Sequence, residues 1–186
     1  MQPTADLTCP MERLAEAAAR AECATADGLV AVDELLRGYP ADPRLHFLKG
    51  SLLAALDRFG EARAAFEAAL RIDPQFALAR FQLGLLELSS GDAASASATW
   101  EPLLHLDPAE PLRLFAEGLQ KLAVDDFAGA ETRLKMGIER NTATPLLNRD
   151  MQLVLDRMAA RPASEPEAFS SSAQLLLQMS GKGTRH

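Results

Sequence analysis

Residues 43–76 read PRLHFLKGSLLAALDRFGEARAAFEAALRIDPQF, and this stretch sets the pattern for the rest of the chain. Two following stretches align with it without gaps. Residues 77–110 read ALARFQLGLLELSSGDAASASATWEPLLHLDPAE, and residues 111–144 read PLRLFAEGLQKLAVDDFAGAETRLKMGIERNTAT. A unit of 34 residues therefore occurs three times, which is typical of proteins that stack copies of one small structural unit.

Three columns of this alignment combine small and large side chains. The first column holds glycine, the second holds alanine, and the third, four residues after the alanine, holds a large apolar residue. The first half of a unit also carries apolar residues at helical spacing, as at Leu45, Leu48 and Leu52. Small residues let two helices approach closely, and the large residue fills the remaining space. The pattern predicts two packed helices per unit, with these columns between them: Gly50, Gly84 and Gly118; Ala62, Ala96 and Ala130; Phe66, Trp100 and Leu134.

The period and the columns resemble the tetratricopeptide repeat, in which each unit is a pair of antiparallel helices. The resemblance implies an all-α fold, a right-handed α-solenoid of antiparallel helix pairs. We expect one helical domain over residues 1–160, followed over residues 161–186 by a flexible tail with a short apolar segment. The expected parts of the domain are a degenerate unit at about 9–42, the units 43–76, 77–110 and 111–144, and a capping helix at 145–160.

Local signals refine the helix boundaries. Asp-Pro occurs at 42–43, 73–74 and 107–108, and we expect each pair to end one helix and start the next. The reason is that Asp can cap free backbone N–H groups and that Pro is tolerated at the first helical position. The pair Asp125-Asp126 is interpreted as a turn and a helix cap. Pro102 removes a backbone hydrogen bond inside a second helix, so we expect that helix to be kinked or shortened.

The composition is that of a globular protein and disfavours several functions. Of the 186 residues 48% are hydrophobic and 24% are charged, and the formal net charge of −7 disfavours binding to nucleic acid or anionic lipid. No run is long and apolar enough to cross a bilayer, so we expect no membrane insertion. Cys9 and Cys23 fit a reducing compartment. We expect a cytoplasmic protein without a signal peptide, and the excess of Arg over Lys suggests a bacterial source.

No group of residues predicts catalysis, a metal site or a cofactor. His46 and His105 lie at different positions of different units, without partners at ligand or triad spacing. The glycines are spread singly and form no phosphate-binding loop. We therefore expect that the chain is not an enzyme and needs no metal and no cofactor.

Three phenylalanines occupy the fifth position of successive units. In the tetratricopeptide family this position belongs to the first helices, which line the concave side of the array. Two interpretations stay open: each ring is buried against its neighbours, or the rings contribute to an open apolar groove that needs a partner. The second interpretation gives these candidate partner-binding residues: Phe47, Ser51, Leu78, Phe81, Leu85, Leu88, Leu112, Phe115, Leu119 and Leu122.

Such a groove suits an apolar or amphipathic segment of a protein or peptide partner. The carboxylate-binding form of the family uses Lys, Arg and Asn on the inner face, whereas here Arg44 is the main inward cation, so that mode is disfavoured. The tail offers a further hypothesis, because Leu175, Leu176, Leu177 and Met179 form an apolar island on a short tether. The tail would occupy its own groove or that of a neighbouring chain, unless the island is only a frayed helical end.

The resemblance implies a protein–protein interaction module, acting as an adaptor, a chaperone or an assembly factor. One alternative is a self-associating scaffold, in which the Ala-rich first helix forms a homodimer contact. Another is a regulatory subunit of an enzyme. In size and organisation the chain is also similar to the small secretion chaperones of pathogenic bacteria, which have three such repeats and an apolar groove.

Overall fold

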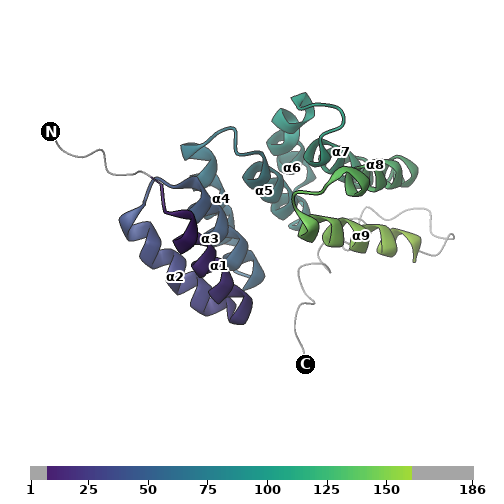
Figure 1. The fold of residues 1–186 in the computed structure, drawn as a ribbon. Coiled ribbons are helices and arrows are strands. Elements are labelled where there is room, and N and C mark those ends of the chain that lie inside the picture. Colours follow the sequence, from purple (N-terminus) through teal and green to yellow (C-terminus); the bar gives the residue numbers. More distant parts are fainter. Residues whose placement is uncertain (1–7, 161–186) are drawn as a thin grey trace. The chain divides into compact units, whose positions relative to one another are not determined.

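A computed structural model describes residues 8–160 of the chain. This part is all-α, as predicted, with nine α-helices, one short 3₁₀ helix and no strand in these residues (Figure 1). The elements in chain order are α1 (Met11–Cys23), α2 (Thr25–Gly38), α3 (Pro43–Ala55), α4 (Phe59–Ile72), α5 (Ala77–Ser89), α6 (Ala93–Trp100), η1 (Glu101–His105), α7 (Pro111–Ala123), α8 (Phe127–Arg140) and α9 (Pro145–Ala159).

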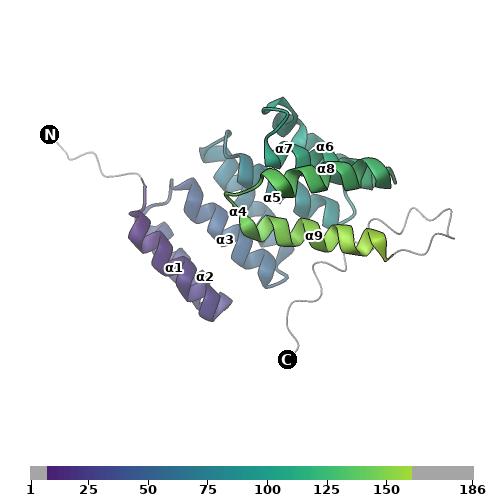
Figure 2. The same ribbon diagram turned by 45° about the vertical axis from the view of Figure 1, so that its right-hand side comes forward.

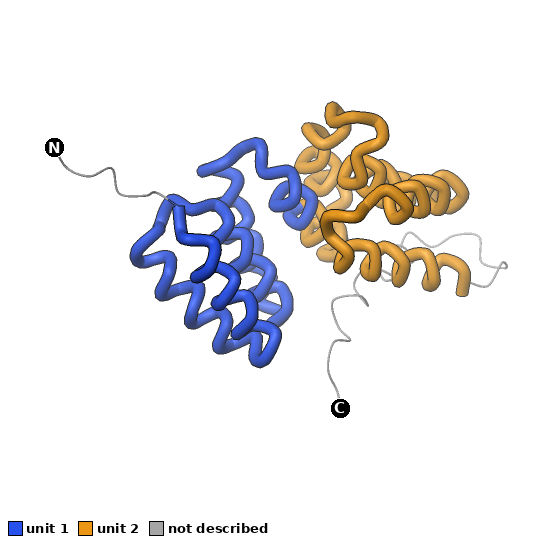
Figure 3. The backbone as a smooth tube through the Cα atoms, in the orientation of Figure 1, with its two compact units in different colours: residues 1–83 blue, residues 84–186 orange. Residues whose placement is uncertain are grey.

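The chain divides into two compact units, Met1–Leu83 and Gly84–His186, whose boundary lies within α5 (Figure 3). The sequence led us to expect one helical domain over residues 1–160. Unit 1 contains α1 to α4 and the first half of α5, and unit 2 contains the rest of α5 and the helices up to α9.

The helices of unit 1 succeed one another in chain order, each packed on the one before it (Figures 1 and 2). Thus α2 packs on α1, α3 packs on α2, and α4 packs on α3. The connections are short, and Ala24 alone separates α1 from α2. Val32, Leu45, Leu53 and Phe66 are buried between these helices. The helices of this unit therefore form the consecutive pairs that the resemblance implies.

The glycine column and the large column meet inside each helix pair, which confirms the predicted packing. A Cβ atom placed on Gly50 would overlap the ring of Phe66, and one on Gly84 would overlap the indole of Trp100. A Cβ atom on Gly118 would likewise overlap the side chain of Leu134. Phe66, Trp100 and Leu134 are almost wholly buried. The absent side chain of each glycine thus provides the space that the large residue of the facing helix fills.

One turn recurs between the two helices of three pairs. Asp57, Gly91 and Asp125 occupy the same position of successive units, and all three have positive φ angles, of 58°, 84° and 60°. The following residue donates its N–H to a carbonyl five residues earlier, as from Asp126 to Lys121. This bond closes the end of the first helix. Asp126 then accepts a hydrogen bond from the Gly129 N–H, which confirms the predicted turn and cap.

Unit 2 continues with helix pairs and one added helix. Helix α8 packs along α7, and α9 packs on α8. The turn before α9 is fixed by Asn141, which is buried and donates from its side chain to the Thr144 carbonyl and the Asn148 Oδ1 atom. Asn148 donates back to the Asn141 carbonyl. These bonds hold the start of α9 against the end of α8.

Pro102 shortens α6, as predicted. The helix ends at Trp100 after eight residues, and the chain continues as the 3₁₀ helix η1 with Pro102 in its first turn. Leu103, which stands where the neighbouring units have the smaller Ala69 and Gly137, is buried with an exposed fraction of 2%. The 3₁₀ turn therefore keeps an apolar anchor although the α-helix has stopped.

The prediction that each Asp-Pro pair starts a helix is correct only at Asp42-Pro43, whereas Asp73-Pro74 directly follows the end of α4. There Asp42 caps α3 and Pro43 is its first residue. Asp73 instead accepts the N–H of Gln75 in a turn before α5, which begins at Ala77. Asp107 forms the same kind of turn, because it accepts the N–H of Ala109, and α7 begins at Pro111. The pairs differ because Pro43 is itself the first residue of a unit, whereas 73–74 and 107–108 lie inside the last four residues of theirs.

Within residues 8–160 no helix has the length and apolar character needed to cross a membrane.

Candidate functional site

Half of the ten candidate partner-binding residues are buried, so for these five the first of the two interpretations, burial against their neighbours, is correct. The buried ones are Phe81, Leu88, Phe115, Leu119 and Leu122, of which only Leu88 has an exposed fraction above zero, at 4%. Phe115 shows the physical cause. Its ring lies where a Cβ atom of Gly137 would be, so it packs inside its own helix pair and contributes to the core of unit 2. These five side chains offer no surface to a partner.

The other five candidates are half-buried, and the two units share them. Phe47 and Ser51 lie one turn apart on α3, and Leu78 lies at the start of α5, so unit 1 holds three of them. Leu85 and Leu112 belong to unit 2. Ser51 donates its hydroxyl to the carbonyl of Phe47, so its polar group is satisfied within the helix. The accessible apolar surface among the candidates in unit 1 is therefore centred on Phe47.

Phe47 belongs to an aromatic group that the sequence analysis did not identify. Its ring centroid lies 5.2 Å from that of Phe76 and 5.9 Å from that of Phe66, with tilted ring planes in both pairs. Phe66 is buried in the core, whereas Phe47 and Phe76 are half-buried. Phe76 is the last residue of its 34-residue unit, at a position without a repeated residue type, so the repeat pattern carried no signal for it. The three rings therefore lie in series, from the buried Phe66 through Phe47 to Phe76.

Arg44, the inward cation of the sequence analysis, is fully engaged by a buried carboxylate. Asp42 is wholly buried and accepts from the Arg44 backbone N–H at 2.9 Å and from its guanidinium at 2.7 Å and 3.0 Å. The same guanidinium donates to the Cys9 carbonyl at 2.6 Å, and the Cys9 N–H donates to Asp42 at 2.7 Å. These bonds tie the segment before α1 to the start of α3. Arg44 is thus a structural residue.

The charge of Asp42 is maintained in this site. Burial raises the pKa of the Asp42 carboxyl group, but the hydrogen bonds from Arg44 and from the Cys9 N–H, with the positive charge of Arg44, outweigh burial and hold that pKa below its ordinary value. Burial and the charge of Asp42 raise the pKa of the Cys9 thiol, which keeps it protonated and unreactive. The site supports structure and provides no nucleophile.

The described residues contain no candidate metal site. Among residues 8–160 no cluster of three or more His, Cys, Asp or Glu side chains could hold a metal ion. His46 contacts the Pro40 carbonyl at 2.8 Å, and His105 contacts Glu101 at 2.7 Å, both near the surface. Each of these two histidines thus contacts a residue of its own segment.

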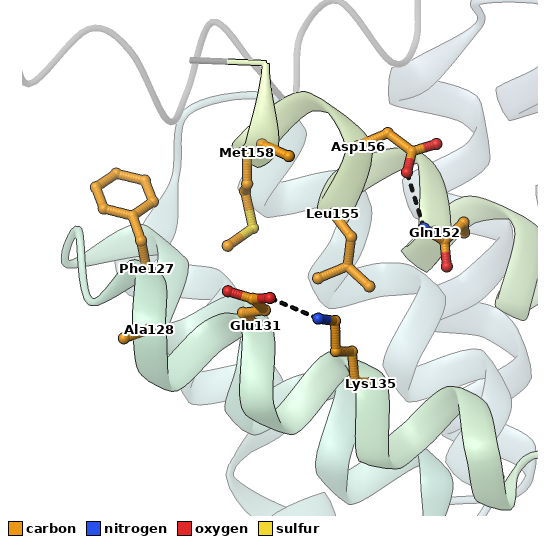
Figure 4. A pocket seen from close by; sticks show the side chains of 9 residues that line it. Phe127, Ala128, Glu131, Lys135, Gln152, Leu155, Asp156 and Met158 are labelled. Carbon is orange, nitrogen blue, oxygen red and sulfur yellow. Dashed lines mark hydrogen bonds and ion pairs between the residues drawn. The ribbon is translucent and has the colours of Figure 1, made fainter. Parts of the chain in front are cut away.

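A second surface feature is a groove of about 390 Å³ between α8 and α9 in unit 2, hereafter the α8/α9 groove. Phe127 and Ala128 line it at the start of α8, and Leu155, Met158 and Ala159 line it toward the end of α9 (Figure 4). The repeat pattern gave no indication of this groove, because one of its walls, α9, lies beyond the last complete unit.

The comparisons with known proteins agree with this fold. The family model for the tetratricopeptide repeat matches residues 43–76. Two solved structures are similar to the chain: the MamA RS-1 ArsTM double mutant, with 16% identity and a TM-score of 0.58, and MamA 41-end from Desulfovibrio magneticus RS-1, with 15% identity and a TM-score of 0.56. Each alignment covers 90% of this chain and 93% of the other. No curated protein matches the chain.

Residues 43–76 match a tetratricopeptide repeat, and the recurring turn and the glycine-to-large-residue packing show the same helix-pair arrangement in the following units. The likeness to the two MamA structures supports the same fold and carries no function by itself, because the identities are low.

Proposed function

We propose that the chain is a protein–protein interaction module that binds an apolar or amphipathic segment of a partner on unit 1, at the surface around Phe47. The observation that carries the proposal is the half-buried pair of Phe47 and Phe76, whose ring centroids are 5.2 Å apart, with Phe47 also packed against the buried Phe66. Side chains that are already packed against other rings lose little conformational freedom when a partner covers them. The free thiols Cys9 and Cys23 favour a reducing, cytoplasmic setting.

The polar surroundings favour an apolar anchor over a charged one. Arg44 lies on the same helix as Phe47, but its guanidinium is held by Asp42 and by the Cys9 carbonyl. Recruiting it to a partner's carboxylate would break these bonds and leave a buried carboxylate without its cation, which costs several kcal/mol. We therefore propose that recognition depends on an apolar side chain of the partner, which acts without a C-terminal carboxylate clamp.

The size of the effect follows from the area that one ring contributes. Burying a large apolar side chain stabilises a complex by about 1.5–3 kcal/mol. Loss of the Phe47 ring should thus weaken binding by about ten- to hundredfold. Peptides selected by display on the folded chain provide the ligand, and calorimetry measures their affinity for the wild-type protein and for Phe47→Ser.

Phe59→Ser is the matched control, because Phe59 is also half-buried in unit 1 but begins α4 and is not part of the aromatic group. We expect the control to bind the selected peptides with wild-type affinity. Equal affinity of all three proteins for peptides that carry an apolar anchor would refute the proposed surface.

Self-association is a second candidate function that one observation favours. The outer surface of α1 and α2 is hollowed, and Ala19 and Cys23 of α1 line the hollow beside Val30 of α2, which is 60% exposed. Helix α1 is the Ala-rich helix that was proposed from the sequence as a homodimer contact. Sedimentation of the wild type and of Val30→Glu over a range of concentrations tests it. A dimer that Val30→Glu dissociates supports self-association, and a monomer at every concentration refutes it.

A further inference from the structure

Helix α9 is packed on one side only. Leu147, Met151 and Val154 are buried, whereas Leu146 and Leu153 are exposed by 77% and 41%. In unit 1 the helices follow one another so that α3 packs on α2 and α4 packs on α3. In unit 2, α8 packs on α7 and α9 packs on α8, but no described helix follows α9. Helix α9 thus has the position of the first helix of a pair whose second helix does not occur within residues 8–160.

The α8/α9 groove is lined by apolar side chains and by polar side chains that have hydrogen-bond partners. Phe127 of α8 and the pair Leu155 and Met158 of α9 face it from its two walls (Figure 4). The polar groups that line the groove are already paired within their own helices, and Glu131 and Lys135 lie between Phe127 and Leu155 (Figure 4). Lys135 donates to Glu131 at 2.6 Å on α8, and Gln152 donates to Asp156 at 2.8 Å on α9. An apolar segment can therefore enter the groove without breaking a polar interaction.

Residues 161–186 include an apolar segment and a connection long enough for that segment to bind in the groove. The segment 173–180 reads AQLLLQMS, and twelve residues separate it from Ala160. Such a connection extends to about 40 Å, whereas α9 is only about 22 Å long. The groove is lined up to Met158 and Ala159, so it opens next to the point where the chain leaves α9. Tethering on a short connection gives the segment a high effective concentration at the groove.

We propose that segment 173–180 of the same chain binds in the α8/α9 groove and completes a fourth helix pair with α9. As a helix, the segment would present Leu175, Leu176 and Met179 on one face toward the groove. This proposal concerns unit 2 alone and does not depend on the surface around Phe47. It differs from the hypothesis of the sequence analysis, which placed the tail in the groove of the phenylalanine stripe.

The test compares amide chemical shifts of the full chain with those of a variant that carries Leu175→Ser, Leu176→Ser and Met179→Ser. These substitutions lie outside residues 8–160, so they change no side chain in the core of the described helices. Outside the substituted segment itself, the expected shift changes are confined to residues 127–135 and 152–159. Shift changes elsewhere within residues 8–160, or none within them, would overturn the proposal.

A reciprocal variant blocks the groove from its wall. Ala128 is exposed and lines the groove, so Ala128→Lys should introduce a charge there without disturbing the core, and Ala98→Lys on α6 is its matched control. We expect Ala128→Lys, and not Ala98→Lys, to shift the amides of residues 175–179. Identical tail spectra in both variants would contradict the assignment of the groove.

A disulfide test separates the chain's own tail from that of a second copy. With Cys23→Ser as background, Ala128→Cys and Leu176→Cys should form an intramolecular disulfide whose yield does not change on dilution. A product that is dimeric, or a yield that falls on dilution, would show that a second copy supplies the segment and would overturn the proposal. Absence of a disulfide would overturn it as well.

Discussion

The ring of Phe115 lies over Gly137, in the space that a side chain at position 137 would fill. Residue 137 occupies the column that holds Ala69 in the unit 43–76, where the equivalent ring, Phe47, is only half-buried. The repeated phenylalanine therefore has two roles. Phe115 is a core residue because the facing helix provides an empty space at Gly137, whereas Phe47 reaches the surface of unit 1 beside Phe66 and Phe76.

Gly137→Ala should destabilise unit 2 although alanine is the better helix former. The helix propensity of alanine contributes about 1 kcal/mol, but the added Cβ overlaps the Phe115 ring, and overpacking of a core costs about 1–3 kcal/mol. We expect a net loss of about 1 kcal/mol, measured by urea unfolding. Gly60→Ala is the control, because nothing lies within 4 Å of a Cβ there, and it should be stabilising. A stabilised Gly137→Ala variant would contradict the packing of Phe115.

The fold could be read from the sequence because its determinants recur. The spacing of Gly50, Gly84 and Gly118 predicted where helices meet, and Pro102 predicted where one helix stops. The site could not be read equally well, because exposure at the phenylalanine column depends on what the facing helix offers. The equivalent column holds Gly137 in the unit of the buried Phe115, and Ala69 in the unit of the half-buried Phe47. Phe81 is also buried although its unit holds Leu103 there, and a period of 34 residues does not report these differences.

Asp42 should make the stability of unit 1 depend on pH in the acid range. Its folded-state pKa is held below the ordinary value of 3.8, so its contribution is complete above that pH and is lost as the pH falls through the folded-state pKa. At neutral pH, Asp42→Asn should cost about 2–3 kcal/mol, because it leaves the partly buried Arg44 without its carboxylate. Urea unfolding of both proteins from pH 7 downward measures the difference.

The stability gap between wild type and Asp42→Asn should narrow below about pH 4, where the wild-type carboxylate takes up a proton. Asp73→Asn serves as a control, since Asp73 only accepts the Gln75 N–H in a turn. We expect it to change stability by less than about 0.5 kcal/mol. A gap between wild type and Asp42→Asn that is constant from pH 7 to pH 3 would be inconsistent with the hydrogen-bonded carboxylate.

The recurring turn predicts a specific cost at Gly91. Its φ angle of 84° is unfavourable for a residue with a Cβ atom, so Gly91→Ala should destabilise the protein by about 1 kcal/mol. Gly38, the last residue of α2, has no positive φ, and nothing lies within 4 Å of a Cβ atom placed there, so Gly38→Ala should not be destabilising. The midpoint of thermal unfolding distinguishes the two variants, and equal losses would argue against strain at the turn.

The most direct test of the proposed function maps a selected apolar peptide onto unit 1 by its effect on backbone amide shifts. The account predicts that titration of the wild-type protein shifts the amides of residues 44–51 and 76–78, and that Phe47→Ser, checked to be folded by circular dichroism, loses these shifts at the same peptide concentration. Shifts confined to other residues, or unchanged in Phe47→Ser, would contradict the claim that this surface binds a partner.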